Sequence, residues 1–216
     1  MSSLDDAINE YFGKKEVIAE VINHFILKEE VNPSEMVPVD TMPVFHKLKY
    51  YGSKLTVEKL QNKYRNLFLM KTEKFYCALL VETEVNNALP IKACLLESGL
   101  YATQIETWDC LDNGGLLPCI TVALYLGSKH CTQHGIASEH PADYCFYMIE
   151  PAKIFDDKID ELSEDLGEVL RFVKISDDAN KRQEFLLSEV YARMGSSAKE
   201  LIRCLSSNLR YIFLDL

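Results

Sequence analysis

The sequence lacks the motifs that identify several large classes of enzyme. It contains no G-x-x-x-x-G-K-S/T loop to hold nucleotide phosphates and no G-x-S-x-G turn to expose a nucleophilic serine. Seven cysteines and five histidines make chance pairings common, so no nucleophile and general base can be assigned. The sequence therefore gives no support for a P-loop enzyme or for a hydrolase with a serine or cysteine nucleophile.

Long apolar segments and paired cysteines are missing too. The first thirty residues contain several acidic side chains and no continuous apolar run, so they predict neither a signal peptide nor a membrane span. The cysteines are odd in number and none forms a C-x-x-C pair, which indicates reduced thiols rather than a disulfide framework. We expect a cytoplasmic protein with no membrane partner.

An excess of positive charge is also absent. The 33 acidic and 23 basic residues give a formal net charge of -10, so the average field of the molecule repels nucleic acid. Contact with DNA would need a local basic patch. The richest basic stretch runs from His46 to Lys74, and either a solvated surface or a DNA-binding patch would account for it.

Periodicity and turn signals predict a folded α/β or α+β core. With 216 residues, 48% of them hydrophobic, the chain suffices for one domain with or without a helical appendage. Prolines make residues 31–41 a loop that carries Asp40 towards an extended segment. Helices are expected at residues 16–27, 90–108, 156–174 and 179–214, and strands at 64–70, 75–85, 116–129 and 144–151.

Several segments resemble a known family when they are taken in order. They are "EVIAEVINHFI", "PVDT", "KYRN", "NALPIKACL", "LLPCITVALYLGSK", "YMIEPAKI" and "DLGEVLRFVKIS". Their order and spacing, from residue 12 to about residue 176, resemble the Rpn-like transposases of the PD-(D/E)xK nuclease superfamily. "LIRCLSSNLRYI" is similar to the family's C-terminal end. The resemblance implies a restriction-endonuclease-like mixed sheet flanked by helices, with an N-terminal segment (1–11), a nuclease-like core (12–155) and a C-terminal helical region (156–216).

The same resemblance implies a catalytic hairpin that is altered here. The family has an Asp at the end of the first hairpin strand and an E-x-Q on the second. Counted back from the "NALP" segment, the Asp falls on Asn66, and E-x-Q falls on Leu80-Val81-Glu82. Mg²⁺ prefers carboxylate and water oxygens, so a neutral amide and a leucine weaken the site and Glu82 alone is retained. We therefore expect a degenerate active site.

Other carboxylates keep a metal site open. Glu20 matches the acid on the family's first helix, Asp40 matches the Asp of its "DT" segment, and Glu84 shares a strand face with Glu82 by alternation. These four are the candidate ligands for Mg²⁺, the cofactor expected if the protein is active. The catalytic candidates are Glu20, Asp40, Asn66, Glu82 and Lys92, the last near the phosphate.

Three functions are compatible with these residues. We favour a catalytically impaired, transposase-like protein, a pseudoenzyme that acts as a nucleic-acid-binding or interaction module. An active Mg²⁺-dependent DNA endonuclease of the recombination-promoting type is the first alternative. The second is a regulatory partner of an intact homologue, with association, including a homo-oligomer, through the C-terminal helices. A zinc site at Cys131, His134 and His140, near His130, is a further hypothesis, although this spacing matches no standard closed site.

Overall fold

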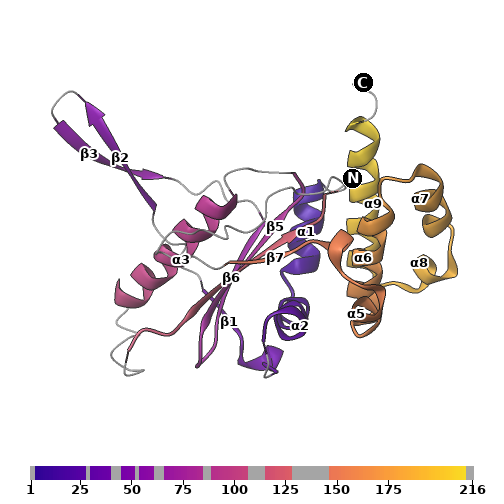
Figure 1. Cartoon of the computed structure of the whole chain (residues 1–216), viewed down its shortest axis with the longest axis horizontal. Helices are drawn as coiled ribbons and strands as arrows, with labels where there is room; N and C mark the ends of the chain where they lie inside the picture. Colours follow the sequence, from indigo (N-terminus) through magenta and orange to yellow (C-terminus); the bar gives the residue numbers. More distant parts are fainter. Residues whose placement is uncertain are drawn as a thin grey trace.

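The protein is a mixed α+β structure with a five-stranded mixed sheet flanked by helices (Figure 1). The computed structural model describes residues 3–27, 30–39, 45–51, 54–60, 66–84, 89–106, 115–127 and 146–212. Its helices are α1 (Leu4–Phe12), α2 (Lys15–Phe25), α3 (Leu89–Glu106), α5 (Asp156–Asp160), α6 (Glu164–Ile175), α7 (Ala179–Leu186), α8 (Glu189–Arg193) and α9 (Ser196–Ile212), with short 3₁₀ turns η1 (Pro33–Glu35) and η2 (Pro151–Lys153). Its strands are β1 (Val37–Pro38), β2 (Phe45–Tyr51), β3 (Lys54–Leu60), β4 (Leu67–Lys71), β5 (Tyr76–Glu82), β6 (Cys119–Tyr125) and β7 (Tyr147–Ile149).

The main sheet has the strand order β1-β4-β5-β6-β7. β1, β4 and β5 are antiparallel neighbours, whereas β5, β6 and β7 run parallel to one another. A parallel pair needs a long crossover, and α3 lies in the chain between β5 and β6. β5 occupies the centre of the sheet, and all its residues except Glu82 are buried. The end of β5 is therefore the point where this strand leaves the core.

The two faces of the sheet are covered by different helices. On one face, Leu79 and Val81 of β5 share a large core with α1, α2, α6 and α9. On the other face, Leu80 packs with Leu96 of α3 and Ala123 of β6. Alternate residues of a strand point to opposite faces, so β5 supplies both cores. Figure 1 shows α3 separated by the sheet from α1 and α2.

Helix α1 joins the N-terminal residues to the C-terminal helices. Ser3 and Asp6 form a reciprocal capping box, in which the Asp6 N–H donates to Ser3 Oγ at 3.1 Å and the Ser3 N–H donates to Asp6 Oδ2 at 3.0 Å. Hydrogen bonding of the Asp6 carboxyl with the Ser3 side chain and with the Ser3 backbone N–H lowers the pKa of that carboxyl. The buried residues Ile8 and Phe12 then share the main core with α9. The two ends of the described chain thus stabilise each other.

A second, two-stranded sheet stands apart from the main one. β2 and β3 pair antiparallel from Phe45 opposite Leu60 to Tyr51 opposite Lys54. Figure 1 shows this ribbon projecting away from the rest of the molecule. The sequence patterns did not predict it.

Most expected elements are present, with three differences. The helix expected at 156–174 is divided into α5 and α6. The helices expected at 16–27 and 90–108 are α2 and α3, and the expected hairpin is β4–β5, closed by the Thr72 N–H donating to Phe75 O at 2.9 Å. The expected loop 31–41 contains β1, which extends the sheet. The expected helix 179–214 is divided into α7, α8 and α9, because Ser188 caps a new helix by accepting from the Tyr191 N–H. In the described part of the chain, no helix is long and apolar enough to cross a membrane.

Candidate functional site

An ion pair lies where β5 leaves the core and α3 begins. The Lys92 ammonium donates to Glu82 Oε1 at 2.7 Å, and the two side chains are 27% and 18% exposed. The Leu126 N–H holds the Glu82 backbone by donating to its carbonyl at 2.7 Å. Lys92 lies in the first turn of α3, where the helix dipole is already positive, so the carboxylate offsets local positive charge. We call Glu82 and Lys92 the β5–α3 pair.

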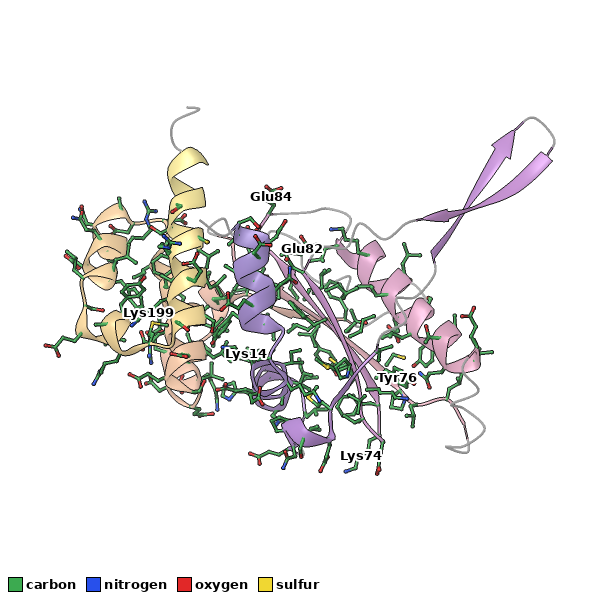
Figure 2. The ribbon with its side chains drawn as sticks, turned by 180° about the vertical axis from the view of Figure 1, so that it is seen from behind. Lys14, Lys74, Tyr76, Glu82, Glu84 and Lys199 are labelled. Carbon is green, nitrogen blue, oxygen red and sulfur yellow. The ribbon has the colours of Figure 1, made fainter. Side chains whose placement is uncertain are left out.

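Glu84 lies close in sequence but outside this pair. It follows the end of β5 and is exposed to solvent. Figure 2 labels Glu82 and Glu84 and shows Glu84 beyond the end of the strand. Alternation predicted that Glu82 and Glu84 share one face of a strand. β5 ends at Glu82, so the sheet does not orient the Glu84 side chain towards the β5–α3 pair.

Asn66 lies just before β4 and makes its contact with a different helix. Its Nδ2 donates to Asp5 Oδ1 of α1 at 3.1 Å. The residue is 9% exposed and has a φ of 59°, a left-handed conformation that asparagine tolerates better than most residues. Its Oδ1 is buried and accepts no hydrogen bond within the described structure. The amide is thus directed to α1, whereas the Glu82 carboxylate is directed to α3.

Leu80 is part of the core. It is fully buried, pairs with Leu67 across the hairpin, and packs with Leu89, Leu96 and Ala123. The position to which the resemblance assigns an acidic ligand is therefore filled by apolar packing on the α3 face of the sheet.

Glu20 has a structural partner far away in the sequence. Its carboxylate accepts hydrogen bonds from the backbone N–H of Ser163 and from Ser163 Oγ, the latter at 2.7 Å. Ser163 is the N-cap residue of α6, and its own side chain makes no capping bond. Glu20 therefore caps α6 from the neighbouring helix α2. The buried residues of α2 pack in the core on the other side of the sheet from α3. The structure does not bring it to the β5–α3 pair.

An acidic cavity beside α2 is a feature that sequence reasoning missed. Its volume is about 700 Å³, and five glutamates line it: Glu16, Glu20, Glu30, Glu35 and Glu161. Asn23 holds one wall by bonding both backbone groups of Val31, at 2.9 and 2.8 Å. This lining repels anionic ligands, so the cavity is unsuited to the phosphates of nucleic acid. The spacing of Glu16 and Glu20 on one helix was its signal in the sequence.

Comparisons with known proteins do not assign the chain to a family. No family model matches the sequence, no curated protein matches it, and no solved structure matches it. A function therefore has to be inferred from the residues and their arrangement.

The capacity of the described residues to hold a metal is small. Within the described ranges, no group of three or more His, Cys, Asp or Glu side chains is assembled as a metal ion would require. Glu82 supplies one carboxylate, which is the minimum for Mg²⁺ sites in proteins, where one or two carboxylates act together with substrate phosphates and water. Asp40 and the cluster of Cys131, His134 and His140 lie outside the described residues.

Proposed function

We propose that the chain is a PD-(D/E)xK nuclease-like, transposase-related protein that has lost most metal-dependent cutting and acts as a nucleic-acid-binding module. The observation that carries this proposal is the β5–α3 pair. Glu82, at the Gln position of the implied E-x-Q, contacts Lys92 at 2.7 Å, while Leu80, at the Glu position, is enclosed in the core.

The arrangement of the elements supports the nuclease-like scaffold. A mixed sheet with helices on both faces, and a β4–β5 hairpin beside the N-terminal helices, is compatible with a restriction-endonuclease-like fold. In such a scaffold the hairpin would carry the metal ligands. Here its two ends make separate contacts, Asn66 with α1 and Glu82 with α3.

The chemistry of hydrolysis explains why cutting would be impaired. Cleavage of a phosphodiester needs a cation to polarise the phosphoryl group and to acidify a water molecule. Mg²⁺ at Glu82 would compete with the Lys92 ammonium for the carboxylate and would gain one carboxylate ligand. An ammonium at the start of a helix is better suited to contact a phosphate than to activate a metal-bound water.

The ribbon β2–β3 offers the basic patch that an acidic protein needs to bind DNA. Its two strands contain four lysines and one glutamate, in a chain of net charge -10. A two-stranded ribbon has the width of the major groove of B-DNA. Its projection from the body keeps it away from the acidic bulk of the molecule (Figure 1).

A binding and cleavage assay tests the proposal. The chain is incubated with single- and double-stranded DNA at low salt, with Mg²⁺ or Mn²⁺. We expect salt-dependent binding without cleavage, and weaker binding when Lys47 and Lys49 are both replaced by Glu. Lys181→Glu, on the surface of α7, is a control with half that change in charge and should bind as the wild type does. Absence of binding at low salt, or equal loss in the control, would refute the binding role.

An active Mg²⁺-dependent endonuclease is the alternative that the β5–α3 pair also favours. A carboxylate for the metal and an ammonium for the phosphate already lie within 2.7 Å of each other. This alternative predicts cleavage that is abolished by Glu82→Ala and strongly reduced by Lys92→Met, with Glu73→Ala, in the exposed turn between β4 and β5, as the control. Cleavage with that pattern would replace the proposal of an impaired enzyme.

A further inference from the structure

The outward face of α3 is apolar where a surface helix is normally charged. Four of its exposed residues, Leu95, Ser98, Ala102 and Ile105, follow one another at spacings of three, four and three residues, and the fifth is Glu106 at the end of the helix. Leu95 is 42% and Ile105 is 58% exposed. None of the four carries a charge, whereas a helix that faces only water usually presents charged residues there. We call these four residues the α3 stripe.

The opposite side of α3 is already used by the fold. Ala93, Leu96 and Leu100 are buried against the sheet. Of the described helices, α3 is the one on this face of the sheet, and Figure 1 shows no other labelled helix against its outer side. The helix is therefore apolar on two sides, of which the sheet covers one. The three- and four-residue spacing of the α3 stripe is the spacing found where two helices pack together.

We propose that a second copy of the chain covers the α3 stripe, with the two α3 helices packed antiparallel about a twofold axis. The stripe is symmetric in size about its centre. In an antiparallel pair, Leu95 lies opposite Ile105 of the second copy, and Ser98 lies opposite Ala102 of the second copy. Large residues then meet at both ends and small residues in the middle, where the helices approach most closely, and each surface complements itself as a twofold interface requires.

The polar group within the stripe can be buried without being left unpaired. Ser98 Oγ donates to Cys94 O at 2.9 Å within the helix. A buried hydroxyl without a partner would oppose association, whereas this one keeps its hydrogen bond when water is excluded. The centre of the stripe can therefore close against a second helix.

Charge favours an antiparallel second copy over a parallel one. The described side chains of α3 include three charged residues: Lys92 near the N-terminal end, which is paired with Glu82; Glu97; and the exposed Glu106 at the C-terminal end. Antiparallel packing brings exposed Glu106 to the start of the other helix, where the dipole is positive. Parallel packing would place the like-charged ends together.

The C-terminal helices are less suited to this association. Ala198, Leu201, Ile202 and Leu205 of α9 are buried in the core of their own chain. The α3 stripe is small beside the roughly 800 Å² per partner of standard interfaces, so we expect a dissociation constant in the micromolar range.

Sedimentation velocity across the micromolar range tests the dimer. The wild type should change from monomer to dimer, and Leu95→Glu should weaken association about 100-fold or more, because each contact occurs twice in a twofold dimer. Leu187→Glu is the matched control, since Leu187 is an exposed leucine at the end of α7, and it should dimerise as the wild type does. Circular dichroism checks that both variants are folded.

A charge-exchange variant tests the antiparallel register. Leu95→Glu and Ile105→Lys should each give monomers. The double variant should regain association, because each Glu then faces a Lys of the second copy. Salt should weaken this regained association. A wild type that stays monomeric, an unaffected Leu95→Glu, or a double variant that stays monomeric would each overturn the proposal. These outcomes do not depend on DNA binding or cleavage.

Discussion

Replacing Glu20 by alanine separates its role in the structure from the catalytic role that the family resemblance implies. The Glu20 carboxylate binds the backbone N–H and the hydroxyl of Ser163, the N-cap residue of α6. A cap residue is typically worth 0.5–2 kcal/mol, and a negative charge at a helix N-terminus adds a favourable interaction with the dipole. Ser163 is accessible to water, which would replace part of the lost bonds. We therefore expect Glu20→Ala to lower the free energy of unfolding by about 1–2 kcal/mol.

Urea and thermal unfolding measure this loss. For a chain of this size, it corresponds to a fall in melting temperature of about 3–6 °C, with an unchanged dependence on urea. Glu20→Gln, which keeps an acceptor but removes the charge, should lie between the wild type and the alanine variant. Glu16→Ala is the matched control, because Glu16 is an exposed residue of the same helix that lines the same cavity, and it should change stability by less than about 0.5 kcal/mol.

One result would refute this interpretation of Glu20. If Glu20→Ala left stability unchanged but abolished a Mg²⁺-dependent cleavage, the residue would act as a metal ligand rather than as the cap of α6. A loss of stability in the Glu16 control equal to that in Glu20→Ala would also contradict it.

Three further predictions follow from buried and partly buried groups. Gln104 bonds both backbone groups of Leu117, at 3.0 and 2.7 Å, so Gln104→Leu should lower the free energy of unfolding by about 2–4 kcal/mol in urea, and a loss below about 1 kcal/mol would contradict this. Burial raises the pKa of the Cys77 thiol to about 12, so at pH 8 only about one molecule in ten thousand is a thiolate, and native Cys77 should resist iodoacetamide in peptide mapping. Because this pKa is raised, the thiol's contribution to stability is complete below its ordinary value and is lost as pH rises towards 12. Asn23→Leu should speed hydrogen exchange at the Val31 amide, and unchanged protection there would show that Asn23 does not hold this wall of the cavity.

Local patterns predicted the elements whose burial repeats regularly along the chain. The alternation and turn chemistry of the β4–β5 hairpin and the apolar run of β6 are read directly from neighbouring residues. The ribbon β2–β3 was missed although it is also local, because its lysines and prolines nearby were interpreted as surface and loop. Helix α1 was missed because its signal is a four-residue capping box before a short amphipathic segment.

The candidate site could be predicted only as a set of residue types. Glu82 and Lys92 are ten residues apart and come together, because β5 ends where the next helix begins. Glu20 and Asn66 were assigned to the same site by resemblance, but each found a partner elsewhere, 143 and 61 residues away in the sequence. No local pattern encodes which distant side chain will pack beside them.

The sequence by itself determined most of the strands and helices of the core, the acidic net charge and the presence of the uncharged residues Asn66 and Leu80 in the hairpin. These are properties of single residues and their near neighbours. The tertiary structure alone decided that Glu20 caps α6, that Glu82 is held by Lys92, and that the second side of α3 is left apolar at the surface. These depend on how elements pack across the sheet, because the fold sets the distance between two side chains that are remote in the sequence.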